Sequence, residues 1–232
     1  RLASVETLGS TQVICCDKTR TLTQGKMEAD KIYTVEEEFE ISESEKNRNF
    51  LQTLRIAALC NDAFVENPTE KMADWKLGGT PTGKALLMAG AKIGILKTEL
   101  DESTKLVNTK PFDSVVKYQA ALYNEGDKQI LYFTGAPERI LEKSLKILND
   151  TFIDKLSPDN YQDLNRKLDV LTSQGLRVIG TAYKEFPLDK KVNIEEEFKD
   201  LVFSGFLTLK DPLRPDAKSA LNKCKSAGIE LI

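Results

Sequence analysis

Near its start the chain places an acid directly after a short apolar run. Residues 13–16 are apolar, and Asp17, Lys18 and Thr19 follow them. A short apolar run between polar residues predicts a buried parallel strand, with Asp17 at its carboxyl end. Ligands bind at that end of α/β sheets, and an Asp carboxylate can act as a covalent nucleophile in phosphoryl transfer. We therefore expect Asp17 to accept a phosphoryl group, and hydroxyls and amides from Thr19 onward to hold the phosphate.

The full run at residues 17–23 reads Asp-Lys-Thr-Arg-Thr-Leu-Thr. The first three residues alone would favour an Asp-initiated turn after a strand. The longer run resembles the phosphorylation signature of P-type ATPases, Asp-Lys-Thr-Gly-Thr-Leu-Thr, with Arg20 in place of Gly. Residues 4–9, Ser-Val-Glu-Thr-Leu-Gly, also resemble that family's approach to the strand. The resemblance is to type II cation pumps, which include sodium/potassium, proton and calcium pumps.

Residues 111–119, Pro-Phe-Asp-Ser-Val-Val-Lys-Tyr-Gln, form a second motif. They resemble the Pro-Phe-Asn-Ser-x-x-Lys-Tyr-Gln stretch of sodium- and proton-pumping relatives. An exposed ring at Phe112 can stack on adenine, worth roughly 1–3 kcal/mol by analogy with base stacking. Lys117 would then reach phosphate or ring acceptors in the same pocket. Without the nine-residue resemblance, Phe112 would be read as a core residue beside a solvated lysine.

Two further motifs point to the same pocket. Residues 134–138 read Thr-Gly-Ala-Pro-Glu where the family has Lys-Gly-Ala-Pro-Glu, so Thr134 replaces a pocket lysine and we expect reduced ATP affinity. Gly135 allows close backbone approach to a flat ligand. Arg177 matches the family arginine that reaches the nucleotide phosphates, and a guanidinium fork suits phosphate oxygens. On its own, Arg177 would be read as a surface charge.

Residues 211–215, Asp-Pro-Leu-Arg-Pro, resemble the family's Asp-Pro-Pro-Arg. The resemblance implies that Asp211 and Arg214 stand at a domain hinge and help place the nucleotide's ribose and phosphates. The two prolines also stiffen a connection, which is the purely structural interpretation. A glutamate that lies near adenine in type II relatives is replaced by Gly83, so we expect weakened or retuned nucleotide binding.

The elements that must position these motifs follow from apolar spacing and from Gly and Pro signals. Helices are predicted over 45–60, from Pro81 to about Ile93 with Thr80 as N-cap, from Gly135–Glu138 to about Leu148, over 157–175, and over 216–227. Strands are predicted over 106–123 and 129–133, joined by a hairpin turn at 124–127, and over 176–183, 201–209 and 229–232.

This order places α/β material at both ends and antiparallel strands with helices in the middle. We predict an α/β (α+β) chain with an antiparallel sheet flanked by helices, inserted into a truncated Rossmann-like phosphorylation domain of the haloacid dehalogenase type. The predicted boundaries are 1–27 for the first piece of that domain, 28–207 for the nucleotide-binding domain, and 208–232 for the hinge and return piece.

Composition sets outer limits on function. The chain has 232 residues, 41% hydrophobic and 30% charged, with a net charge of −3, which gives no electrostatic case for binding nucleic acid. Histidine is absent, which excludes Ser-His and Cys-His catalysis. The four cysteines lack Cys-x-x-Cys spacing and predict buried free thiols in a reducing compartment. No apolar run approaches the about 20 residues of a membrane helix, and no secretion signal is visible.

The resemblance implies an ATP-driven cation translocase that uses ATP and Mg²⁺. Asp17, Lys18 and Thr19 would be catalytic, and the Asp17 carboxylate with the Thr19 backbone carbonyl would bind Mg²⁺. The nucleotide ligands would be Phe112, Lys117, Gly135, Arg177, Asp211 and Arg214. The implied partners are adenine nucleotide, the actuator and transmembrane domains of the same pump, and a transported cation that this part does not bind. The implied place is the cytoplasmic face of a membrane.

The sequence as given ends before the family's Thr-Gly-Asp loop and Gly-Asp-Gly-x-Asn-Asp segment. We therefore expect it to bind adenine nucleotide weakly and not to hydrolyse it. Arg20 either blocks phosphorylation or reflects an altered sequence, and both interpretations stay open. Two other functions also stay open. A soluble haloacid-dehalogenase-type phosphatase is disfavoured because Thr19 stands where such enzymes usually carry a second Asp. A non-catalytic nucleotide-binding or regulatory module is favoured by the departures at Arg20, Gly83 and Thr134.

Overall fold

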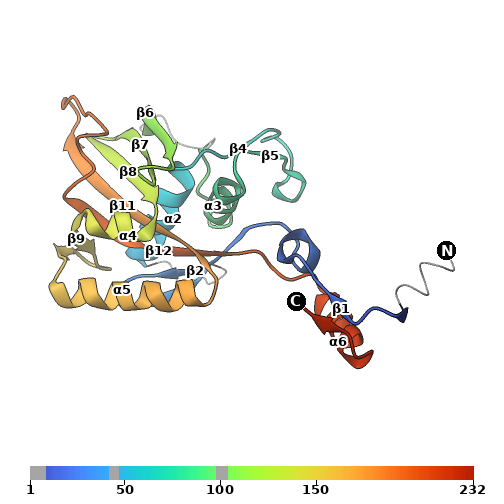
Figure 1. Ribbon diagram of the computed structural model, residues 1–232. Coiled ribbons are helices and arrows are strands. Elements are labelled where there is room, and N and C mark those ends of the chain that lie inside the picture. The colour runs from blue at the N-terminus through green and yellow to red at the C-terminus, as the bar shows by residue number, and fades with distance from the viewer. Residues whose placement is uncertain (1–8, 42–46, 98–103) are drawn as a thin grey trace. The chain divides into compact units, whose positions relative to one another are not determined.

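The computed structural model describes residues 9–41, 47–97 and 104–232, and Figure 1 shows its elements along the chain. Residues 4–8 of the lead-in to the first strand lie outside the described residues. The chain divides into two compact units. Unit 1 comprises Arg1–Met27 and Asp211–Ile232, and unit 2 comprises Glu28–Lys210.

Unit 2 is built on one large sheet. Over the described residues this sheet has nine strands, in the order β10-β9-β12-β11-β8-β7-β6, with β2 paired to β12 and β3 paired to β2. The β9–β12 pair is parallel and the other pairs are antiparallel. The strands are β2 (Glu28–Tyr33), β3 (Glu38–Glu40), β6 (Thr104–Asp113), β7 (Tyr118–Glu125), β8 (Lys128–Gly135), β9 (Ser144–Leu148), β10 (Ile153–Lys155), β11 (Arg177–Pro187) and β12 (Leu201–Lys210).

Helices cover both faces of this sheet. Strand β8 alternates between the faces, as extended backbone requires. Leu131 and Phe133 belong to a core that includes side chains of α4 and α5. Ile130 and Tyr132 belong to a second core against α2. The helices are α2 (Arg48–Leu59), α3 (Pro81–Ala91), α4 (Pro137–Glu142) and α5 (Pro158–Ser173). The predicted antiparallel sheet flanked by helices is therefore confirmed.

Several predicted helix signals are also confirmed. Thr80 caps α3, and its hydroxyl accepts a hydrogen bond from the Gly83 amide at 3.1 Å. Ser157 caps α5 in the same way through the Asn160 amide. Gly175, just past the end of α5, has a φ of +75°, which favours glycine after a helix end. A small hairpin, β4 (Phe64–Val65) and β5 (Leu77–Gly78), encloses the short helix η2 (Met72–Asp74) between α2 and α3.

One predicted helix is wrong in its extent. The helix expected to run to about Leu148 ends at Glu142, as α4, and β9 begins at Ser144. Strand β9 pairs with β12 on one side and β10 on the other, and Ile147 is buried in the core. Sheet pairing on both edges of this segment therefore overrides its helix-like apolar spacing.

Unit 1 is smaller. It contains β1 (Val13–Ile14), the irregular turn η1 (Lys18–Leu22), α6 (Ala217–Ser226) and β13 (Glu230–Leu231). Strands β1 and β13 are parallel, as predicted, but β1 is not buried, because Val13 is 44% exposed. Over the described residues β13 is the sole sheet neighbour of β1, so β1 is an edge strand of a two-stranded sheet.

The prediction of buried thiols holds for one cysteine. All four cysteines are free thiols; Cys60 is buried, Cys15 is exposed, and Cys16 and Cys224 are half-buried. Over the described part of the chain, none of the helices combines the length and the apolar character that crossing a lipid bilayer requires.

Candidate nucleotide site

Unit 2 contains a cavity of ≈ 810 Å³ beside the ends of several sheet strands. This volume lies within the range of small-molecule sites. The walls come from the end of β6 and the turn after it, the end of β8, the start of α4, the start of β11 and the start of α3. The lining residues are Asp62, Thr80, Pro81, Thr82, Gly83, Leu86, Pro111, Phe112, Ser114, Lys117, Gln119, Thr134, Gly135, Ala136, Pro137, Glu138, Arg177, Val178 and Ile179.

Phe112 and Lys117 are brought to the cavity by the turn between β6 and β7. The Asp113 carboxylate accepts the Val115 amide at 2.7 Å, and the Asp113 carbonyl accepts the Lys117 amide at 2.7 Å. These bonds close an Asx-type turn. The Phe112 ring is 56% exposed, so it is a wall of the cavity and not a core side chain. An aromatic face that water can reach is available for stacking.

Gly135 lies at the end of β8, opposite Tyr118 of β7. A Cβ at this position would lie 2.4 Å from the Lys117 carbonyl oxygen and 2.8 Å from Tyr118 Cα. The Ala136 amide donates to the same carbonyl at 2.9 Å. The glycine therefore lets β8 pass close to the turn that carries Lys117. This packing role is additional to the close backbone approach to a flat ligand that the sequence predicts for Gly135.

Arg177 begins β11 and reaches across to α3. Its Nη1 donates to the Thr82 hydroxyl at 2.7 Å. The second cation, Lys117, lies 3.8 Å from a Glu138 carboxylate oxygen, and both of these side chains are more than half exposed. The cavity thus carries two cations, each held by a polar group on a neighbouring element. Both remain accessible to an anionic ligand.

Thr134, which stands in the place of the family lysine, is buried at the back of the cavity. Its hydroxyl donates to the Cys60 carbonyl at 2.8 Å and accepts from Gln119 Nε2 at 2.8 Å. Burial raises the pKa of the neighbouring Cys60 thiol to about 12. This wall of the cavity is neutral, which agrees with the expectation that Thr134 removes a positive charge.

The lining residues that the sequence reasoning did not assign to the site include Glu138, Thr82 and Asp62. Glu138 and Thr82 each lie within a motif used for another residue, so the motifs could have indicated them. Asp62 lies in the loop after α2 and belongs to none of the motifs. Only the folded chain brings it to the start of α3.

The other candidate residues lie in unit 1. Asp17, Lys18 and Thr19 are exposed and follow β1. The segment η1 is not a regular helix, because Thr19 has φ −76° and ψ 126°, and Arg20 has φ 65°. A positive φ favours glycine and costs a residue with a side chain roughly 1–2 kcal/mol. Arg20 therefore occupies a backbone conformation that suits the glycine of the resembling motif.

Asp211 and Arg214 bind the segment that leads out of η1. The Asp211 carboxylate accepts from the Thr23 hydroxyl at 2.7 Å, the Gly25 amide at 2.9 Å and the Lys26 amide at 3.2 Å. Arg214 donates to the Arg20 carbonyl at 2.8 Å and to the Thr23 carbonyl. These contacts tie the two chain segments of unit 1 together.

Metal binding at Asp17 can be judged from the donor groups present. Mg²⁺ is usually bound by one or two carboxylates together with phosphate oxygens and water. Across residues 9–41, 47–97 and 104–232, no group of three or more His, Cys, Asp or Glu side chains could hold a metal ion. A Mg²⁺ ion held by Asp17 and the Thr19 carbonyl would therefore need further ligands, such as phosphate oxygens and water.

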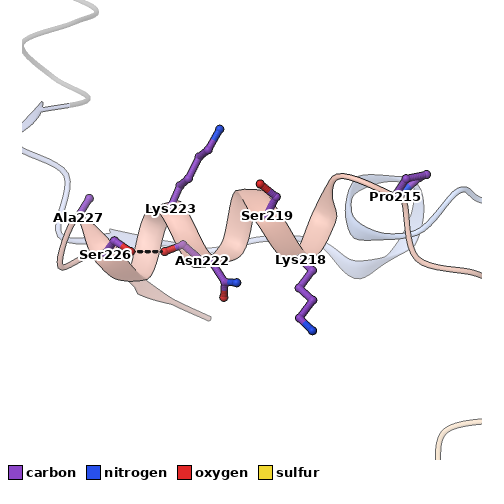
Figure 2. A pocket seen from close by; sticks show the side chains of 7 residues that line it. All are labelled: Pro215, Lys218, Ser219, Asn222, Lys223, Ser226 and Ala227. Carbon is purple, nitrogen blue, oxygen red and sulfur yellow. Dashed lines mark hydrogen bonds between the residues drawn. The ribbon is translucent and has the colours of Figure 1, made fainter.

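A second hollow lies along α6 in unit 1. One helix and its flanks line it, and Figure 2 shows Lys218 and Lys223 extending in opposite directions from that helix. The polar groups do not converge on a point. This hollow is therefore a solvated helix surface and not a candidate ligand site.

Comparison with known proteins gives consistent matches. A family model described as P-type ATPase, cytoplasmic domain N, matches residues 49–216. A calcium-transporting ATPase of Bacillus subtilis (strain 168) is 30% identical over 250 residues, covering 100% of this chain and 28% of the relative. The sodium/potassium-transporting ATPase subunit alpha-2 of Gallus gallus is 33% identical over 259 residues, covering 100% of this chain and 25% of the relative. The chain thus spans about a quarter of the length of these curated relatives.

Proposed function

Because this chain belongs to the P-type ATPases and contains their cytoplasmic domain N, we propose that unit 2 binds adenine nucleotide in the cavity described above. The main support for the proposal is that the four residues predicted to bind the nucleotide in this unit line the same cavity. Phe112, Lys117, Gly135 and Arg177 come from separate parts of the sequence and line one cavity. A nucleotide needs an accessible ring to stack on its base and cations to bind its phosphates, and this cavity has one such ring and two cations. Gly135 adds a backbone stretch without a side chain.

Each group has a distinct task in this proposal. The Phe112 face stacks on the base. Lys117 and Arg177 neutralise phosphate oxygens, and phosphate displaces the Glu138 carboxylate from Lys117 and the Thr82 hydroxyl from Arg177. Both displaced partners lie at accessible positions, so water can satisfy them at little cost. The neutral wall at Thr134 lowers the affinity below that of a relative with a lysine there.

For the whole protein we propose a cation pump, since the relatives matched are calcium- and sodium/potassium-transporting ATPases. The Asp17 carboxylate would attack the terminal phosphate of ATP and form an aspartyl phosphate, with Lys18 and Thr19 beside the transferred group. Mg²⁺, when bound, would offset the charge on that group, with Asp17 and the Thr19 carbonyl as its ligands from this chain. Unit 1 would be a piece of the phosphorylation domain into which unit 2 is inserted, and Asp211 and Arg214 would stand at the hinge. The implied place is the cytoplasmic face of a membrane.

Calorimetric titration of the chain with ATP and with GTP tests the nucleotide proposal. We expect saturable binding of ATP, with weaker binding of GTP and no release of inorganic phosphate. The matched variants are Phe112→Ala and Phe152→Ala, since Phe152 is 55% exposed and lies outside the cavity. Phe112→Ala should weaken ATP binding by roughly 1–3 kcal/mol, because it removes the ring on which the base stacks. Phe152→Ala should leave ATP binding unchanged. Equal affinity for ATP and GTP, or equal loss in both variants, would contradict the proposal.

Phosphorylation at Asp17 is tested in the full-length protein, by radiolabelled phosphoenzyme formation from ATP. Asp17→Asn should abolish the phosphoenzyme. Arg20→Gly should raise its level, because it removes the positive-φ strain and a bulky side chain three residues after the phosphorylated one. Phosphoenzyme that persists in Asp17→Asn would overturn the assignment. A non-catalytic nucleotide-binding role, favoured by Arg20, Gly83 and Thr134, would instead be supported if neither the original chain nor Arg20→Gly forms phosphoenzyme.

A further inference from the structure

The cavity of unit 2 has two carboxylates in its wall, and they are engaged differently. Glu138 lies 3.8 Å from the Lys117 ammonium. Asp62 accepts two hydrogen bonds, both from Thr80: the backbone amide at 2.9 Å and the hydroxyl at 2.8 Å. An ionised carboxylate has about four acceptor positions. Asp62 therefore keeps acceptor capacity, and it lines the cavity.

Asp62 also fills space that the chain leaves open at the start of α3. A Cβ built on Gly83 would lie 2.1 Å from Asp62 Oδ1. No side chain can be added at residue 83 unless this carboxylate moves. The absence of a side chain at Gly83 thus allows a carboxylate from another loop to reach the cavity wall.

The loop that carries Asp62 is held on both sides. Lys97 Nζ donates to the Asn61 carbonyl at 2.7 Å and to the Ala63 carbonyl at 3.3 Å. Asn61 also ties the loop to the end of α2, since its Nδ2 donates to the Ala57 carbonyl at 2.7 Å. These bonds immobilise the residues before and after Asp62. A carboxylate held in this way can select a ligand by direction as well as by charge.

We propose that Asp62 determines base specificity in the nucleotide site by accepting a hydrogen bond from the exocyclic amino group of adenine. This inference rests on the proposed nucleotide-binding function. A carboxylate repels phosphate and can only accept hydrogen bonds, so Asp62 would meet an uncharged donor of the nucleotide, a ribose hydroxyl or the base amino group. An analogue that lacks only the amino group distinguishes the two. Adenine offers a donor at its 6-amino group, whereas guanine has an acceptor oxygen at that position.

The test compares ATP with purine riboside 5′-triphosphate, which lacks only the 6-amino group, by calorimetric titration. The unaltered chain should bind ATP about tenfold more tightly, as expected for one hydrogen bond to a charged group. Asp62→Ala should remove this preference by weakening ATP binding about tenfold, with little effect on the analogue. Asp62→Asn, which keeps an acceptor oxygen and a similar volume, should retain part of the preference.

Two control variants separate recognition from structure. Thr80→Ala removes the hydroxyl bonded to Asp62 and disturbs the start of α3, while the carboxylate remains. Glu138→Gln alters the other carboxylate of the cavity. Both should keep the preference for ATP over the analogue. If Asp62→Ala keeps the preference, or if Thr80→Ala loses it equally, the Asp62 carboxylate only anchors Thr80, the N-cap of α3, and the inference is overturned.

The outcomes also separate this inference from the function on which it rests. If the unaltered chain binds ATP and the analogue equally, the specificity role of Asp62 fails while nucleotide binding stands. If the chain binds neither nucleotide, the proposed function itself fails. Circular dichroism of each variant shows whether it is folded. If Asp62→Ala does not fold, the nucleotide preference is measured in Asp62→Asn instead.

Discussion

Gly135 shows how a single residue sets the shape of the candidate site. Strand β8 reaches the turn after β6 at this point, and the Lys117 carbonyl occupies the space where a side chain would be. The need for glycine therefore arises from the packing of two backbone segments. In the proposed nucleotide site a ligand would benefit indirectly, because the same close approach places Lys117 on the cavity wall.

Gly135→Ala tests this explanation. The added Cβ would lie 2.4 Å from the Lys117 carbonyl oxygen, so the strand or the turn must shift. We expect the free energy of unfolding to fall by about 1–3 kcal/mol, measured by urea denaturation. Gly126→Asn is the control, because a Cβ at Gly126 meets nothing within 4 Å and Asn tolerates its φ of +61°. Equal stability of Gly135→Ala and the unaltered chain would contradict the explanation.

Because the Cys60 thiol is buried, its ionisation should lower the free energy of unfolding as the pH rises above about 9. Burial raises the pKa of its thiol from an ordinary value of 9.0 to about 12. The unfolded chain therefore loses this proton first as the pH rises. The thiol's contribution is complete below about pH 9 and is lost progressively between about pH 9 and 12, by at most about 1.4 kcal/mol per pH unit.

Urea denaturation between pH 8 and pH 10 measures this effect. The unaltered chain should lose stability more steeply than Cys60→Ala over this range. Burial raises the pKa of Tyr123 and Tyr183 to about 12. Tyr183 contributes equally in both proteins, whereas the pKa of Tyr123 is also raised by the Cys60 charge, which Cys60→Ala removes. Parallel pH profiles would show that the thiol does not titrate as its burial requires.

At the scale of elements, the sequence identified those whose ends carry strong local signals. Thr80 and Ser157 are N-caps with Pro next in the chain, and Gly175 follows a helix end with positive φ, so α3 and α5 were predictable. The stretch after α4 was not. Its apolar residues suit either period, and pairing with β12 and β10 makes it a strand, in which Leu145 is exposed and Ile147 is buried in the core. Such long-range pairing has no local signal.

The same distinction applies to the candidate site. Phe112, Lys117, Gly135 and Arg177 could be grouped from sequence motifs alone. Asp62 could not, because its place at the cavity depends on how the loop after α2 meets α3. The purely structural reason for Gly135 likewise depends on the register of β7 and β8.

The hydrogen bonds of Asp211 connect the two chain segments of unit 1, and their contribution can be measured. The Asp211 carboxylate accepts the amides of Gly25 and Lys26 and the hydroxyl of Thr23. Asp211→Ala should therefore speed hydrogen exchange of the Gly25 and Lys26 amides by about tenfold, since bonds to a charged acceptor contribute roughly 1.5–3 kcal/mol. Asp216→Ala is the control, because the Asp216 side chain makes no capping bond to α6. Unchanged exchange in Asp211→Ala would contradict a tethering role.

At the scale of the whole molecule, the chain is a sheet-based unit carrying a cavity, together with a smaller unit carrying Asp17. Membership of the P-type ATPases gives this division a functional meaning. One unit would hold the nucleotide, and the other would supply the carboxylate that accepts its phosphate. The central claim is that the cavity of unit 2 is where the nucleotide binds.

That claim is tested most directly by following the backbone amide resonances of the isotopically labelled chain as ATP is added. We expect the resonances of Gly83, Lys117, Gly135 and Arg177 to shift together and to saturate with one affinity. The resonances of β9 and β10, which do not line the cavity, should stay in place. Saturable shifts confined to residues outside the cavity, or no shifts at millimolar ATP, would contradict it.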